Sequence, residues 1–229
     1  THLGVYMVKK AVTANTSTLL FDHDGTLINS EAVHYKLWYE ILLPYGVSLS
    51  ESLYCDMMAG VPVKQNAIDL KNHFDISAST LALENEKHEK VEAFLKEQPF
   101  PLMPYAAETI KACHEKGYTL AIVTGGSKLS VEKTLDGYGL REYISTVVAV
   151  EDVTRSKPDP ESYQLAMEKL GVAASACVAI EDTMHGLQSA VAAKLDCVVI
   201  PTAQTANHDL GLATVSYGSL QHWLEAEVL

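Results

Sequence analysis

Short apolar runs alternate with amphipathic stretches along most of the chain. Five runs predict strands, at 18–21, 119–123, 146–150, 177–180 and 197–200. They contain few polar residues, as is typical of strands whose two faces are both covered by helices. The remaining stretches predict helices, at 106–116, 128–138, 160–170 and 184–194. This alternation favours an α/β fold with a doubly wound, Rossmann-like parallel sheet.

A helical segment interrupts the alternation after the first predicted strand. The first two strands are much further apart in sequence than the roughly 30 residues of an ordinary βαβ unit. Apolar residues recur at the helical interval in three segments between them, at 33–42, 67–74 and 81–95. The proline-rich segment PFPLMP, residues 99–104, marks the return of the chain to the sheet. We therefore predict a core of residues 1–29 and 101–229 and an inserted helical domain of residues 30–100.

The charge and cysteine content exclude several classes of partner. The 229 residues carry 17 basic and 29 acidic side chains, a formal net charge of −12. Such a surface repels nucleic-acid backbones and anionic lipids, so we expect neither nucleic acid nor membrane as a partner. Four cysteines without zinc-site spacing are expected to be buried thiols in a cytoplasmic protein. The chain starts at Thr1, and we expect residues 1–6 to precede a natural start at Met7.

Two aspartates follow the first predicted strand directly, in the string TLLFDHDGTL at 18–27. Asp22 and Asp24 are two positions apart, so their side chains project to the same side of the sheet. Gly25 permits a tight turn, and we assign the amides of Gly25 and Thr26 to the binding of an anion. His23, between the aspartates, is expected to be a spacer that points away from the site. Ligands of open α/β sheets bind beyond the carboxyl ends of the strands, where this string lies.

Polar residues also follow later strands of the predicted sheet. A threonine and a Gly-Gly-Ser turn come after 119–123 and can donate hydrogen bonds to phosphate oxygens. A lysine in the loop SKPDP, 156–160, supplies a compact positive charge, and an adjacent Glu and Asp after 177–180 are suitable ligands for Mg²⁺. Because parallel strands end at the same edge, we predict that one site joins both aspartates to Thr124, Gly125, Ser127, Lys157, Glu181 and Asp182.

These motifs and their order resemble the haloacid dehalogenase-like phosphohydrolase superfamily, over nearly the whole chain. The helical insertion is similar to the family's small cap domain, and the branch with β-phosphoglucomutase and sugar-phosphate phosphatases is the most similar. The matching strings are FDHDGTLINSE (21–31), VTGGS (123–127), SKPDPESYQLAMEKLGV (156–172) and IEDTMHGLQSA (180–190).

The resemblance implies an Mg²⁺-dependent phosphatase that hydrolyses a small phosphorylated metabolite, most simply a sugar phosphate, through an aspartyl-phosphate. Asp22 would be the nucleophile and Asp24 the general acid and base. Thr124 and Lys157 would hold the phosphoryl group. Asp182 would complete the Mg²⁺ site with Asp22 and the backbone carbonyl of Asp24, and Glu181 would assist indirectly or through a water molecule.

Positions in the inserted helical segment distinguish a phosphatase from a mutase. A histidine in the cap of the mutase matches His34. The mutase also has a Gly-Val-x-Arg string in its cap, which aligns with residues 60–63 here. Val63 stands in place of the arginine that binds a second phosphate in the mutase. We therefore favour hydrolysis, with a phosphosugar mutase as the alternative. A phospho-receiver module is a remote alternative, since such domains lack the insertion. His34 and Lys64 are candidate substrate-binding residues, and we expect a monomer or homodimer.

Overall fold

Within residues 9–229, which the computed structural model describes, six parallel strands form one sheet in the order β3-β2-β1-β4-β5-β6. The expectation for residues 1–6 lies outside this range. Central β1 pairs with β2 on one side and β4 on the other. The strands are β1 (Thr18–Phe21), β2 (Thr119–Val123), β3 (Thr146–Val148), β4 (Cys177–Glu181), β5 (Asp196–Val199) and β6 (Val215–Ser216).

Helices cover both faces of the sheet, because the strands are apolar on both sides. Leu19 and Phe21 pack with α5 (Ala106–Glu115), α6 (Lys128–Gly137) and α9 (Leu220–Trp223). Leu20, between them, packs on the other face with α7 (Glu161–Leu170) and α8 (Met184–Ala192). The predicted doubly wound α/β fold is therefore confirmed.

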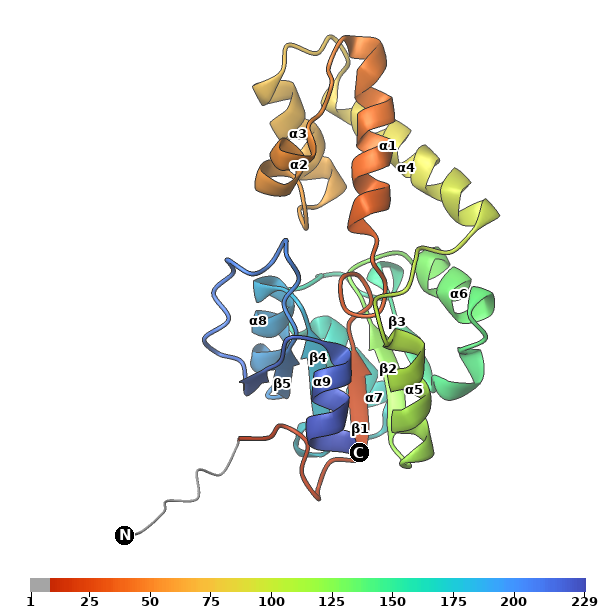
Figure 1. The fold of residues 1–229 in the computed structure, drawn as a ribbon, viewed down its shortest axis with the longest axis vertical. Coiled ribbons are helices and arrows are strands. Elements are labelled where there is room, and N and C mark those ends of the chain that lie inside the picture. Colours follow the sequence, from red (N-terminus) through yellow and green to blue (C-terminus); the bar gives the residue numbers. More distant parts are fainter. Residues whose placement is uncertain (1–8) are drawn as a thin grey trace.

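Four further helices stand together beyond the carboxyl ends of the strands, as Figure 1 shows. They have an apolar cluster of their own, centred on Trp38, Ile41 and Leu70. We call this group the helical unit; its division from the sheet at residues 30 and 100 stays a prediction. The unit comprises α1 (Glu31–Leu42), α2 (Glu51–Met57), α3 (Val63–His73) and α4 (Thr80–Glu97).

The two connections between the sheet and the helical unit run side by side. The Asn29 N–H donates to the carbonyl of Pro101 at 2.8 Å. Ile28 forms β-bridges with both Asp24 and Leu102. The entrance and the exit of the unit therefore meet directly above the two aspartates.

Some elements differ from the sequence-based expectation. Strand β3 ends at Val148 instead of residue 150, where a 3₁₀ turn begins. Three of the cysteines are buried as expected, but Cys55 is exposed, because it lies on the outer side of the short helix α2. None of the helices within residues 9–229 has both the length and the apolar character needed to cross a bilayer.

Candidate active site

Asp22 continues the pairing of β1, and its carboxylate lies buried at the edge of the sheet. Its N–H donates to the carbonyl of Ile180 at 2.9 Å, which fixes it beside the end of β4. Gly25 has a φ of +80°, and a Cβ there would lie 2.1 Å from Oδ2 of Asp182. Glycine is therefore required both for the left-handed turn and for the close approach of this loop to the carboxylate.

The amides of Gly25 and Thr26, which we predict to bind an anion, make hydrogen bonds within the turn in this structure. The Gly25 N–H donates to the carbonyl of Ile28 at 2.9 Å, and the Thr26 N–H donates to that of His23 at 3.3 Å. The Thr26 hydroxyl is buried and has no hydrogen-bond partner in residues 9–229. These bonds hold the shape of the loop, and the role of the two residues in anion binding stays a prediction.

Lys157 crosses from the loop before α7 to the end of β1. Its Nζ lies 3.0 Å from Oδ1 of Asp22, 2.6 Å from Oε1 of Glu181 and 2.8 Å from the carbonyl oxygen of Val123. Burial alone would lower the pKa of Lys157, but the charges of Asp22 and Glu181 outweigh it and raise the pKa above its usual value. The lysine is therefore a fixed positive charge in a dry site.

The charge of Lys157 favours the ionised form of the Asp22 carboxyl group. Burial would raise the pKa of Asp22, but Lys157 and a hydrogen bond from Asp182 outweigh burial and lower the pKa below its usual value. Asp22 is thus an ionised carboxylate at neutral pH.

Glu181 and Asp182 complete a buried acidic cluster at the end of β4. One carboxylate oxygen from each of Asp22, Glu181 and Asp182 lies within 4.8 Å of the others. Oδ1 of Asp182 and Oε2 of Glu181 have no hydrogen-bond partner among the described residues. Burial and the charge of Asp22 raise the pKa of Asp182 well above its usual value and that of Glu181 to about 8. Three converging carboxylates, two of which have an oxygen without a partner, are the donor set that Mg²⁺ takes, so the residues fit that ion.

Asp24 differs from Asp22 in its protonation. Burial and the charge of Asp22 raise the pKa of Asp24 to about 6. The hydroxyl of Ser30, just before α1, donates to Oδ1 of Asp24 at 2.9 Å, a contact that the sequence did not point out. A carboxyl group with a pKa near neutrality can both give and take a proton under working conditions.

The turn after β2 lies against Asp24 through Gly126, whereas Gly125 and Ser127 stay predictions for phosphate binding. A Cβ on Gly126 would lie 2.7 Å from Oδ2 of Asp24, and the Gly126 N–H donates to the buried hydroxyl of Thr124 at 2.9 Å. Gly125 is exposed, with nothing within 4 Å of its would-be Cβ, and Ser127 caps α6 by accepting from the Ser130 N–H. Thr124 is therefore placed as expected, and Gly126 makes the close approach.

Neither helical-unit candidate, His34 or Lys64, forms a hydrogen bond with this cluster in the part of the chain that the structure describes. Nδ1 of His34 lies 3.1 Å from Nζ of Lys87, a buried lysine on α4 that the sequence analysis missed within a Glu- and Lys-rich stretch. Burial lowers the pKa of His34 to about 3 and that of Lys87 to about 8. Both side chains therefore lose their proton at a lower pH than exposed residues of the same type. Lys64 is exposed at the start of α3 and makes none of the hydrogen bonds found among the described residues.

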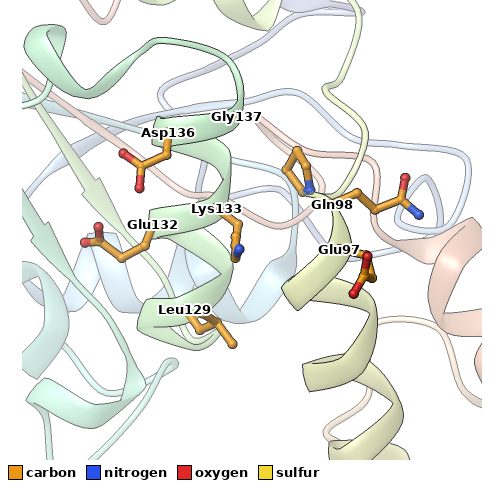
Figure 2. A pocket seen from close by; sticks show the side chains of 8 residues that line it. Glu97, Gln98, Leu129, Glu132, Lys133, Asp136 and Gly137 are labelled. Carbon is orange, nitrogen blue, oxygen red and sulfur yellow. The ribbon is translucent and has the colours of Figure 1, made fainter.

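A separate cleft of about 480 Å³ lies between the end of α4 and α6 (Figure 2). It is lined by Glu97, Gln98, Leu129, Lys133 and their neighbours, and none of the predicted site residues reaches it. The buried acidic cluster at the sheet edge therefore lies outside this cleft.

The chain was compared with known protein families, curated proteins and solved structures. A family model described as haloacid dehalogenase-like hydrolase matches residues 19–200. Fructose-1-phosphate phosphatase YqaB of Escherichia coli (strain K12) is 34% identical over 185 residues, which cover 79% of this chain and 94% of that protein. Hexitol phosphatase B of the same strain is 28% identical over 219 residues, with 92% and 95% covered. The crystal structure of CbbY from Rhodobacter sphaeroides in complex with phosphate has a TM-score of 0.75 at 27% identity, covering 90% of this chain and 95% of that one.

Proposed function

Since the chain belongs to the haloacid dehalogenase-like hydrolase family, we propose that it is an Mg²⁺-dependent phosphatase that uses Asp22 as its nucleophile. It is a phosphoric monoester hydrolase, and its substrate is a small phosphorylated sugar or sugar alcohol. One observation carries the assignment of roles: Nζ of Lys157 lies 3.0 Å from Asp22 and lowers its pKa, whereas Asp24, two residues on, accepts from the Ser30 hydroxyl at 2.9 Å and has a pKa that burial raises to about 6. Two carboxyl groups with such opposite tendencies divide naturally into a nucleophile and a general acid.

The residues act in a fixed order. Ionised Asp22 attacks the phosphorus atom and forms an aspartyl-phosphate, while Asp24 gives its proton to the leaving alcohol oxygen. Asp24, now a carboxylate, takes a proton from the water that hydrolyses the aspartyl-phosphate. Lys157 and the Thr124 hydroxyl stabilise the negative charge on the phosphoryl oxygens.

Magnesium would be held by Asp22, Asp182 and the backbone carbonyl of Asp24, with Glu181 as a further carboxylate beside it. When bound, the ion would offset the repulsion between the Asp22 carboxylate and the phosphate dianion. The oxygens without partners on Asp182 and Glu181 support this assignment.

We also propose that residues 30–100 form a cap that selects the substrate, with His34 and Lys64 on its side of the site. The Ser30–Asp24 hydrogen bond supports this, because it ties the start of α1 to the general acid. The relatives named for fructose-1-phosphate and hexitol phosphates support a sugar phosphate as the substrate. Val63 offers no hydrogen-bond donor for a second phosphate, which favours hydrolysis of a monophosphate over mutase chemistry.

A panel of phosphorylated sugars and sugar alcohols, assayed for phosphate release with Mg²⁺ and with EDTA, tests this function. We expect turnover that requires Mg²⁺ and is lost in EDTA. ³¹P NMR with β-glucose 1-phosphate distinguishes the mutase. Conversion to glucose 6-phosphate without free phosphate would overturn the phosphatase assignment.

A further inference from the structure

His23 stands between the two catalytic aspartates in the sequence, but its side chain points into the core. It is fully buried, and its Nε2 lies 2.9 Å from the hydroxyl oxygen of Thr134 on α6. That hydroxyl donates its own proton to the carbonyl of Ser130 at 3.1 Å. The Thr134 oxygen can therefore only accept from the imidazole, which assigns the proton of neutral His23 to Nε2.

This histidine is a costly choice for a core position. Its Nδ1 is buried and has no hydrogen-bond partner within the described residues. An acceptor left in that state costs about 1–3 kcal/mol, which an apolar side chain of similar size would avoid. Departures from an apolar core that carry a cost are expected where function requires them.

The partner helix is the one that begins at the phosphate-binding turn. Helix α6 starts directly after the turn 124–127 and is capped by Ser127. On the other side of the contact, the backbone carbonyl of His23 accepts from the N–H groups of Leu27 and Ile28, at 2.9 and 3.1 Å. His23 is thus a junction between the loop that carries the aspartates and the helix that carries the turn.

We propose that His23 is a positioning residue, which holds Asp22 and Asp24 in register with Thr124 and Gly126 through its hydrogen bond to Thr134. This inference rests on the proposed function, because it concerns the alignment of groups that act in the hydrolysis. The distance between the general acid and the turn is the quantity it fixes: Gly126 already lies so close to Asp24 that a Cβ would be 2.7 Å from its carboxylate.

Three substitutions test the role of this hydrogen bond. His23→Leu removes the donor and leaves Thr134 with its bond to Ser130, so no polar group loses its only partner. We expect kcat to fall about 10- to 100-fold with KM little changed, because small misplacements of reacting groups are that costly. His23→Gln keeps an N–H near the position of Nε2 and should recover most of kcat. Thr134→Val should reproduce the loss, and the double variant His23→Leu/Thr134→Val should show no further loss.

Thr109→Val is the matched control. Thr109 is a buried threonine on α5 whose hydroxyl likewise donates to the carbonyl four residues earlier, Tyr105 at 2.7 Å, but it has no histidine partner. It should leave kcat unchanged. Thermal unfolding of each variant separates positioning from stability, since His23→Leu should not lower the Tm.

The outcomes are distinct. Wild-type kcat in His23→Leu, or a lowered Tm with unchanged kcat, would show that the histidine only fills space and overturn the inference, while the phosphatase itself stands. A wild-type protein that releases phosphate from no member of the panel would overturn the proposed function and the role of His23 with it.

Discussion

Replacing Lys157 with methionine is the most informative single change, because the two side chains have similar volume and differ in charge. Nζ of Lys157 lies 3.0 Å from Asp22 and 2.6 Å from Glu181, and the lysine side chain is only 9% exposed. Since burial and the charge of Asp22 raise the pKa of Glu181 to about 8, Asp22 is the main ionised partner at pH 7. The variant therefore leaves Asp22 as an unpaired charge in a dry site.

The expected loss of stability follows from that charge. Removing one partner of a buried ion pair costs about 3–5 kcal/mol. For a chain of this size each kcal/mol lowers the Tm by about 2–4 °C, so we expect a fall of about 6–20 °C at pH 7. The difference in Tm between Lys157→Met and the wild type should become smaller at acidic pH. The folded-state pKa of Asp22 is lowered, so its stabilising effect is present above the unfolded value of about 3.8 and is lost as the pH falls through the folded value.

Differential scanning calorimetry in EDTA at pH 7, and at a series of lower pH values that continues below the unfolded value of about 3.8, measures both effects. Lys128→Met is the matched control, since Lys128 forms an ion pair with Asp152 at 3.0 Å but is half exposed, and its Tm should match the wild type. The reasoning is refuted if Lys157→Met unfolds within about 2 °C of the wild type at pH 7, a shift that corresponds to 1 kcal/mol or less.

Three further changes test the chemistry. Asp22→Asn should reduce kcat by several orders of magnitude while circular dichroism shows an intact fold, because an amide cannot form the acyl phosphate; residual turnover near the wild-type rate would contradict a covalent route. Gly126→Ala should lower kcat about 10- to 100-fold by displacing the Asp24 carboxylate, whereas Gly125→Ala, which meets nothing within 4 Å, should be neutral in the same steady-state assay. Mg²⁺ should raise the Tm of the wild type in a thermal-shift titration and leave that of Asp182→Ala unchanged, and an equal rise in both would move the metal elsewhere.

The central strands and their helices could be predicted because burial on both faces leaves a direct mark on the sequence. All four residues of strand β1 are buried, and three of them are apolar, the exception being Thr18. The neighbouring strands β2 and β4 are likewise mostly apolar and buried. Strand β6 has only two residues, of which Val215 is partly buried and Ser216 is exposed, and two positions are too few to form a pattern. Helix α2 was missed for the same reason, since only Tyr54 of its seven residues is buried.

The site could be predicted only as far as chain direction determines it. Residues that directly follow parallel strands, such as Asp22, Thr124 and Asp182, share the sheet edge by topology alone. Contacts from loops and other helices depend on packing and left no such mark: Tyr163 donates to Glu181 at 2.5 Å from within α7, and Ser30 reaches Asp24 from the start of α1. The sequence also does not indicate which glycine of the Gly125-Gly126 pair lies against the Asp24 carboxylate, where the structure has Gly126.

The adjacent connections at Asn29 and Pro101 make the helical unit an exchangeable module. The two ends of the helical unit are joined by one backbone hydrogen bond. The length and structure of the segment between them therefore have little effect on the chain entropy and strain of the sheet. A different set of helices, or a short turn, can be spliced at this point without changing the register of β1 against β2 and β4. Given the proposed role of the helical unit in substrate selection, recombination at this single junction would give the same hydrolytic core new substrates, independently of point substitutions in the sheet.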